Sequence, residues 1–303
     1  MKTNAKGSDF LIGAIDHHDW ADVCCWHRSA LRTGFTGQVV ILCYEHMTEQ
    51  AIARIRAEGI QVLRATSNRG VNEDRFRDVA EFVKTLNPED RIMMCDVRDV
   101  AFQVSIHQVL DRLLADKPLA CASEGMAYSS SEWNLNNVRS NFPDMMDEIG
   151  PMEIYCAGAI AGRAGRFAPF CRAIWEQSIQ AKSFNGDQIA MNLVMRTPEF
   201  AKDVNCLAAD NTLICHHGSP GAAAHMKVEK KALVSLKGER VGVFHQYTRN
   251  PSVRRGTLML HGCLLSFYGG KLITAIRRKL GMQPDWIPYW ITTPASTPQT
   301  QNA

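Results

Sequence analysis

The stretch RIMMCDVRDVAFQ, residues 91–103, is an apolar run that ends abruptly in two carboxylates. Residues 92–95 suit a buried strand, and Asp96 and Asp99 then follow with Arg98 between them. Like charges at the end of a buried strand repel each other unless a cation joins them. A hard divalent ion that takes oxygen ligands fits this position. The alternative is that the pair caps a helix and forms a surface ion pair with Arg98.

Upstream of this stretch, strand-like and helix-like segments alternate. Strands are expected at residues 9–16, 38–45, 60–65 and 91–96, with amphipathic helices between them. The second strand is continuously apolar, as parallel strands buried on both faces require. The alternation predicts a doubly wound, mostly parallel α/β sheet. Ligands of such sheets lie beyond the carboxyl ends of the strands, which is where Asp96 stands.

No glycine-rich phosphate loop follows the first expected strand, where residues 13–20 read GAIDHHDW. The patterns GxGxxG and GxxxxGK[ST] are both absent there. A dinucleotide-dependent oxidoreductase or a P-loop nucleotidase would therefore lack its usual anchor. If phosphates bind to this sheet, a metal ion is the expected anchor.

Composition limits the class of protein. The chain of 303 residues is 46% hydrophobic and 21% charged, which allows one large domain or two small ones. A net charge of +3, without basic runs interleaved with aromatics, argues against nucleic acid as a partner. The ten cysteines form no CxxC pair, and the N-terminus lacks the apolar segment of a secretory signal. We expect reduced thiols in a cytoplasmic protein.

Four further segments carry chemistry downstream. Residues 118–124 read as a short strand that ends in Glu124, and residues 153–165 as a strand with small residues that let a ligand approach the backbone. Residues 185–195 open a helix, and residues 241–249 form a late strand.

The segments DVRDVAFQ, EIYCAGAIAG, NGDQIAMN and VFHQYTR occur in this order. Together they resemble the nucleotide-sugar glycosyltransferases of the GT-A fold. In that family an acidic pair, usually DxD, ends a strand and holds manganese or magnesium against the donor diphosphate. The resemblance implies a catalytic domain at residues 9–257, with a nucleotide-binding half at 9–104 and a mixed α/β sugar and acceptor half at 105–257. Residues 1–8 are expected to be a flexible N-terminus.

The resemblance also implies a metal site. The acidic pair here, DVRD, is one residue longer than DxD. We expect Asp99 to bind Mn²⁺ or Mg²⁺ directly and Asp96 to reach either the metal or the nucleotide ribose. A late histidine often completes the site in the family, which implies His245; the alternative is a satisfied core histidine. A neutral imidazole suits manganese better than calcium.

A nucleoside diphosphate sugar, of the UDP or GDP type, is the donor that the resemblance implies. Ala157 and Gly158 would line the sugar, and Cys156 stands where many relatives carry asparagine. Arg75 resembles a position that contacts the donor nucleotide, although an ordinary exposed arginine is the alternative. Arg249 would pair with a phosphate or with a surface carboxylate.

Two carboxylates are candidates for the chemistry at the sugar and the acceptor. Asp187 and Gln188 correspond to the D-Q helix start of the family, where the aspartate faces the reacting sugar. The alternative for Asp187 is a charge that only complements the helix dipole. Glu124 is the second candidate.

Acceptor recognition is expected from a polar, loop-like stretch that contains Trp133 and Asn134, with residues 216–225 as a mobile lid. The acceptor would be a glycan, a lipid-linked or a protein hydroxyl. For both segments, a plain surface loop is the alternative.

Residues 258–303 are expected to form a basic amphipathic segment followed by a disordered tail. The basic segment would hold a cytoplasmic enzyme loosely at the inner face of a membrane, or it would cap the domain. The sequence thus predicts a metal-dependent glycosyltransferase. The alternatives are a metal-dependent phosphohydrolase and a non-catalytic carbohydrate-binding protein.

Overall fold

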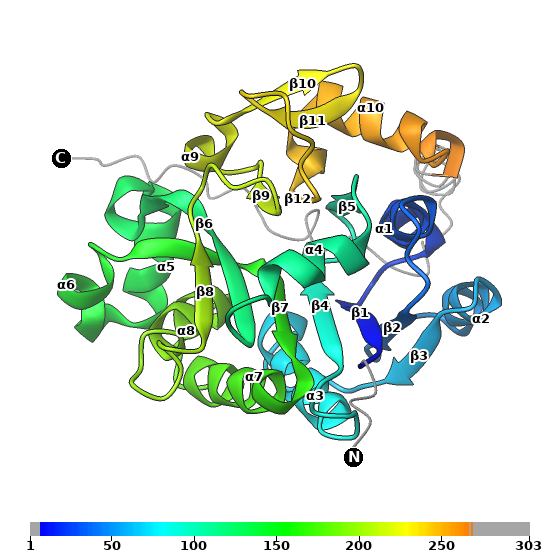
Figure 1. Ribbon diagram of the computed structural model, residues 1–303. Coiled ribbons are helices and arrows are strands. Elements are labelled where there is room, and N and C mark those ends of the chain that lie inside the picture. Colours follow the sequence, from blue (N-terminus) through cyan, green and yellow to red (C-terminus); the bar gives the residue numbers. More distant parts are fainter. Residues whose placement is uncertain (1–6, 267, 269–303) are drawn as a thin grey trace, which may run out of the picture.

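The computed structural model, which describes residues 7–266 and 268, has a seven-stranded sheet at its centre (Figure 1). The strands of this sheet are β1 (Asp9–Ile15), β2 (Gln38–Cys43), β3 (Gln61–Arg64), β4 (Arg91–Cys95), β6 (Leu119–Ala127), β7 (Glu153–Arg163) and β8 (Val204–Leu207). They lie in the order β3-β2-β1-β4-β7-β6-β8. Strand β7 runs antiparallel to β4 and β6, and the remaining pairs are parallel. The predicted mostly parallel sheet is confirmed, and it agrees with a GT-A-like arrangement.

Helices cover both faces of the sheet because alternate residues of each buried strand point to opposite sides. On one face, Leu11 shares a core cluster with side chains of α1, α2 and α4. On the other, Ile12 shares a cluster with side chains of α3, α7 and α8. The bounds are α1 (Trp20–Arg32), α2 (Glu49–Ala57), α3 (Val71–Val83), α4 (Ile106–Leu113), α7 (Ala164–Ser178) and α8 (Asp187–Val194).

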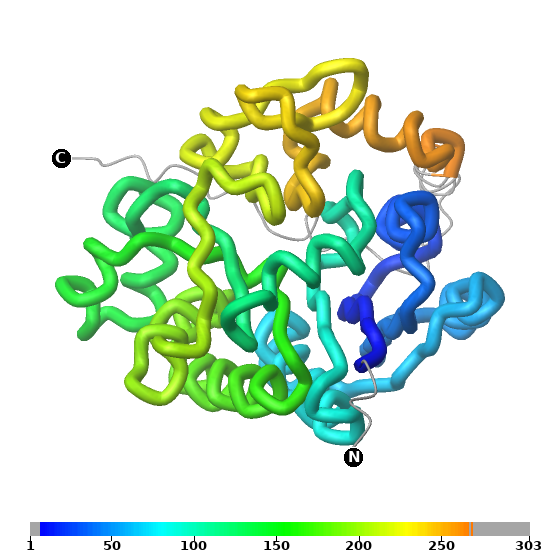
Figure 2. The backbone as a smooth tube through the Cα atoms, viewed as in Figure 1, coloured from blue at the N-terminus to red at the C-terminus, as the bar shows by residue number. Residues whose placement is uncertain are grey.

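A second layer is formed by β5 together with later parts of the chain, and Figure 2 shows those later parts in yellow and orange above the main sheet. Its strands are β5 (Val100–Phe102), β9 (Ile214–His216), β10 (Met226–Glu229), β11 (Ala232–Ser235) and β12 (Val243–His245). Strand β12 lies between β5 and β9, so that His245 is opposite both Val100 and His216. This register brings three distant parts of the sequence to the end of β4.

The remaining helices are α5 (Glu132–Asn141), α6 (Met146–Ile149), α9 (Pro220–Ala223) and α10 (Pro251–Leu260), with 3₁₀ turns at Tyr128–Ser130, Pro143–Met145 and Tyr247–Arg249. Helix α10 runs across the boundary expected between residues 257 and 258. The basic segment at 271–279 and the tail after it lie outside the described residues, as do residues 1–6. Within the described part of the chain, no helix is long and apolar enough to cross a membrane.

One segment expected to be a loop is helical. Trp133 and Asn134 lie in α5, which begins where the Ser131 hydroxyl accepts a hydrogen bond from the Asn134 amide at 3.3 Å. The Asn141 side chain ties the other end of α5 to the Phe184 carbonyl at 3.1 Å. The polar composition of this segment predicts a loop. The segment is helical instead, because the Ser131 cap bonds a backbone amide at its start and Asn141 anchors its end by a tertiary hydrogen bond.

The expected lid at residues 216–225 begins with the last residue of β9 and contains α9. A Cβ added at Gly221 would lie 2.3 Å from the Gly125 carbonyl oxygen, so α9 packs closely on strand β6. The segment is thus a turn-rich connection that contains one short helix.

Gly13, in the middle of β1, lets the loop after β4 pack on the sheet. A Cβ added there would lie 2.3 Å from Cγ2 of Val97 and 3.3 Å from the Trp26 ring. Val97 is only 2% exposed and lies between the two aspartates of the acidic pair. The close approach therefore fixes the position of the acidic loop relative to β1.

We predict that Gly13→Ala lowers the free energy of unfolding by about 1–3 kcal/mol, the usual cost of overpacking. In a Val97→Ala background the clashing methyl is gone, so the same change should cost less than about 1 kcal/mol. Urea denaturation of the four proteins of this cycle measures both costs. Equal costs in the two backgrounds would contradict the assigned contact.

Candidate active site at the end of strand β4

The acidic loop is held on two sides by backbone hydrogen bonds. The Asp96 amide donates to the Gly158 carbonyl of β7 at 2.9 Å. The Asp99 carbonyl accepts hydrogen bonds from the amides of Gln246 at 2.7 Å and Tyr247 at 3.3 Å, just after β12. Both carboxylates are thereby fixed beyond the carboxyl end of β4, at the edge where ligands of doubly wound sheets bind.

His245 brings the two carboxylates together. Its ring is 2% exposed, and its Nε2 lies 3.3 Å from Asp96 Oδ2 and 3.5 Å from Asp99 Oδ1. The ligand atoms of these three side chains all lie within 4.8 Å of one another. Two carboxylates and one imidazole are a donor set that suits Mn²⁺ and, through its oxygens, Mg²⁺.

Gly158 lets these ligands lie close to the backbone of β7. A Cβ at this position would lie 2.4 Å from His245 Cε1 and 2.9 Å from Asp96 Oδ2. Any larger residue would therefore fill the space next to the imidazole and the carboxylate. The three predicted metal ligands and this small residue fit a divalent ion.

Arg75 of α3 is buried, which excludes the interpretation as an ordinary exposed arginine. Its guanidinium pairs with the Asp96 carboxylate through Nη1, and its Nη2 donates to Asp187 Oδ2 at 3.0 Å. The cation that pairs with Asp96 is thus Arg75 from a distant helix and not its neighbour Arg98. Arg75 ties the acidic pair to the start of α8.

The residues expected around the sugar lie together near the acidic pair. Gln188 follows Asp187 in the first turn of α8, and its Oε1 accepts a hydrogen bond from the Ala157 amide at 3.4 Å. Glu124, on β6, is half-buried, and burial raises the pKa of its carboxyl group, an effect that Cys156 and Gln188 partly offset. Strands β6 and β7 and the N-terminus of α8 therefore bring these residues to one place.

The carboxyl groups of the site have different proton affinities. Burial opposes ionisation of Asp96, but Arg75 and His245 outweigh it and lower the pKa of Asp96. Burial raises the pKa of Asp99, of Asp187 and of Glu124. Asp96 therefore remains an anion, whereas Asp187 and Glu124 have the raised pKa values that acid–base groups need.

Arg249 is exposed, in the 3₁₀ turn after β12. Burial raises the pKa of Asp99 and of Glu124, and the charge of Arg249 offsets part of this rise. An exposed cation near the acidic pair can meet the phosphates of a ligand.

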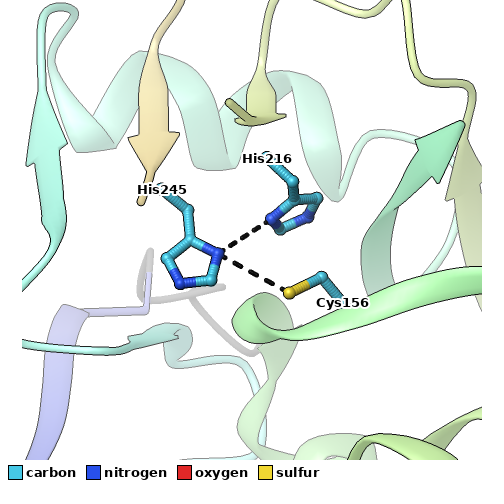
Figure 3. A group of neighbouring side chains, drawn as sticks. All are labelled: Cys156, His216 and His245. Atoms are coloured by element: carbon cyan, nitrogen blue, oxygen red, sulfur yellow. Dashed lines mark hydrogen bonds between the residues drawn. The ribbon is translucent and has the colours of Figure 1, made fainter. Parts of the chain in front are cut away.

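The other nitrogen of His245 faces two residues that sequence patterns do not connect. His245 Nδ1 lies 3.1 Å from His216 Nδ1 and 3.6 Å from Cys156 Sγ (Figure 3). Both are buried, and they come from β9 and β7. The sequence signals this group only through Cys156, which replaces the asparagine of the motif that the segment resembles.

A separate group lies at the ends of β1 and β2, where the sequence predicts no site. The Asp16 carboxylate accepts hydrogen bonds from the His46 amide at 3.0 Å and from its Nδ1 at 2.8 Å. The rings of His17 and His46 stack with centroids 4.2 Å apart. This group lies at the carboxyl edge of the sheet, as the acidic pair does.

Comparison with solved structures finds likenesses of shape. A solved structure described as the WbbM bifunctional glycosyltransferase in its apo form matches with a TM-score of 0.46 and 15% identity. The match covers 72% of this chain and 41% of the other, so this chain spans less than half the length of that protein. No protein-family model and no curated protein matches the chain. The function proposed below therefore rests on the side chains of the site.

Replacing Arg75 by methionine should destabilise the protein by about 3 kcal/mol at pH 7, because two carboxylates lose their cation. The pKa of Asp96 is lowered in the folded state, so its pairing stabilises the fold above the ordinary pKa of aspartate and is lost as the pH falls. The difference between the two proteins should therefore shrink below about pH 4.

Urea denaturation between pH 7 and pH 3 measures this difference. Lys84→Met, at the end of the same helix, is the control, since Lys84 pairs with Glu81 and both side chains are exposed, so the change should cost about 1 kcal/mol or less. A pH-independent loss in Arg75→Met would mean that packing, and not charge, is what Arg75 provides.

Proposed function

We propose that the protein is a glycosyltransferase that moves a sugar from a nucleoside diphosphate sugar to an acceptor hydroxyl with a divalent metal ion. The observation that supports this most is the convergence of Asp96, Asp99 and His245 beyond the end of β4. These side chains would hold Mn²⁺ or Mg²⁺, which would supply positive charge where the departing diphosphate becomes negative.

The donor would lie between the acidic pair and the start of α8. Asp96, which stays ionised beside Arg75, would hold the metal or the ribose of a UDP- or GDP-type donor. Ala157 and Gly158 would line the sugar, because only small side chains fit beside His245. Arg249 would meet the phosphates with its exposed guanidinium.

Asp187 is proposed to act at the sugar or the acceptor hydroxyl. It is buried, has a raised pKa and is oriented by Arg75. Glu124 is the second carboxyl group of the same kind, on the β6 side of the site. The acceptor would be the hydroxyl of a glycan, a lipid-linked sugar or a protein, and Trp133, 65% exposed on α5, offers a flat face for a sugar ring.

The enzyme is proposed to work in the cytoplasm, with peripheral membrane contact through the basic segment near the C-terminus. The acidic pair favours an enzyme over a carbohydrate-binding module, which has no need for two carboxylates and a histidine around one space. A metal-dependent phosphohydrolase would use the same ligands, and it is distinguished by phosphate release from simple phosphoesters.

We predict that UDP or GDP raises the melting temperature in the presence of Mn²⁺ and has little effect without it. At about a hundred times Kd, a ligand stabilises by about 2.7 kcal/mol, which corresponds to several degrees for a domain of this size. Asp99→Asn should abolish the effect of the metal, and Asp116→Asn, at an exposed position, should retain it. Stabilisation by no nucleoside diphosphate under any metal condition would refute the proposed donor site.

The two candidate acid–base carboxyl groups are separated by their kinetics. Asp187→Asn should lower kcat with a panel of nucleotide sugars by about 10²–10⁴, the range for loss of a general acid–base group, with a smaller change in donor affinity. Glu124→Gln should lower kcat less. The raised pKa of Asp187 should place an acidic limb in the pH profile that disappears in Asp187→Asn. A larger effect of Glu124→Gln would reverse the two roles.

A further inference from the structure

His245, His216 and Cys156 form a buried group with three potential metal ligand atoms that point at one another (Figure 3). The side chains come from β12, β9 and β7 and are 2%, 0% and 3% exposed. Hydrogen bonding explains the group incompletely, because the two Nδ1 atoms at 3.1 Å share one proton at most, and His216 Nε2 has no hydrogen-bond partner.

The spacing of these atoms can be compared with that around a tetrahedral metal. Zinc binds histidine nitrogen at about 2.0–2.1 Å and cysteine sulfur at about 2.3 Å, so tetrahedral ligands lie roughly 3.3 Å apart for two nitrogens and roughly 3.6 Å for nitrogen and sulfur. The measured separations are 3.1 Å between the nitrogens and 3.6 Å between His245 Nδ1 and Cys156 Sγ. Small side-chain shifts would therefore admit the ion.

We propose that Cys156 Sγ, His216 Nδ1 and His245 Nδ1 bind one Zn²⁺ ion. The Zn–S bond forms as the S–H bond of Cys156 breaks, and the proton passes to solvent. The metal undergoes no redox change. The set of one thiolate and two imidazoles distinguishes this site from the oxygen-rich acidic pair, because soft ligands select zinc over magnesium and manganese.

The far side of His245 is already arranged as a zinc ligand requires. A histidine that binds zinc through one nitrogen usually donates its other N–H to a carboxylate. Here Nε2 lies within 3.5 Å of oxygens of Asp96 and Asp99. Burial also lowers the pKa of His216 well below its usual value, so its imidazole is the neutral form that ligates.

The proposed zinc site is distinct from the donor metal site but shares His245 with it. A neutral imidazole has one free lone pair and serves one metal at a time. With zinc on Nδ1, the Nε2–H orients the carboxylates, and Asp96 and Asp99 alone hold the donor metal; His245 completes the donor site only in the zinc-free protein. Cys156 and His216 therefore belong to the zinc site alone, and the two proposals can be tested separately.

The test is metal binding by the full chain and its variants. The chain is stripped with chelator, loaded with zinc or cobalt, and measured by elemental analysis, by competition with a chromophoric chelator and by absorption. We expect one zinc per chain and, with Co²⁺, the thiolate-to-metal charge-transfer band and the strong visible bands of a tetrahedral site. Cys156→Ala and His216→Gln should each weaken zinc binding by more than about a hundredfold, since changes to outer partners alone cost 10–100-fold.

Cys171→Ala, which removes another buried cysteine, is the matched control and should leave zinc affinity unchanged. Asp99→Asn should change zinc affinity by no more than about tenfold while it abolishes the effect of Mn²⁺ on nucleotide binding. Wild-type protein without stoichiometric zinc or without the thiolate band would overturn the proposal, and this result needs no variant to fold. Loss of zinc in Asp99→Asn as large as in Cys156→Ala would place the ion at the acidic pair, and would also overturn it.

Discussion

A charged aspartate at the end of the central strand is the constraint on which the site depends. Asp96 is anionic but two-thirds covered, so the fold must supply it with partners. It does so with Arg75 from α3 and with His245 from β12. Removing either partner leaves a poorly solvated charge, and removing Asp96 leaves Arg75 with Asp187 alone. The site and the packing of three distant segments are therefore one electrostatic unit.

The position of the second layer is explained by the same need to give the Asp96 carboxylate a partner. His245 can reach Asp96 only if β12 lies beside β5, which begins directly after Asp99. The β12 register also places His216 next to His245, because parallel pairing with β9 sets the two residues opposite each other. One short three-stranded sheet thus determines what surrounds both nitrogens of a single imidazole. Although the sheet is short, it is packed into the core, because Val243 and Phe244 are buried in the two adjoining core clusters.

What the sequence predicts well is local. The alternation of apolar strands and amphipathic helices up to Cys95 gives the first four strands, and the carboxylate that ends β4 gives the position of the site. The sequence does not predict the contacts between residues that are far apart in the chain. Arg75 lies in a run of charged residues that reads as a solvated helix face, yet Glu73, Asp74 and Arg75 are all buried. Helix α5 is missed for the opposite reason, because its polar residues satisfy one another and a distant backbone.

The position of Cys156 shows how a departure from a family pattern can be read physically. A cysteine in place of an amide loses a strong hydrogen-bond donor and acceptor, which is costly if a sugar hydroxyl is its partner. In this structure its sulfur is buried and lies 3.6 Å from Nδ1 of His245. The thiol also has a pKa raised well above its usual value by burial, so without a metal it is an inert neutral group. A buried thiol and two imidazoles whose ligand atoms lie within 4.8 Å of one another are a donor set for a soft cation, and the charge of that cation would offset the cost of ionising the buried thiol.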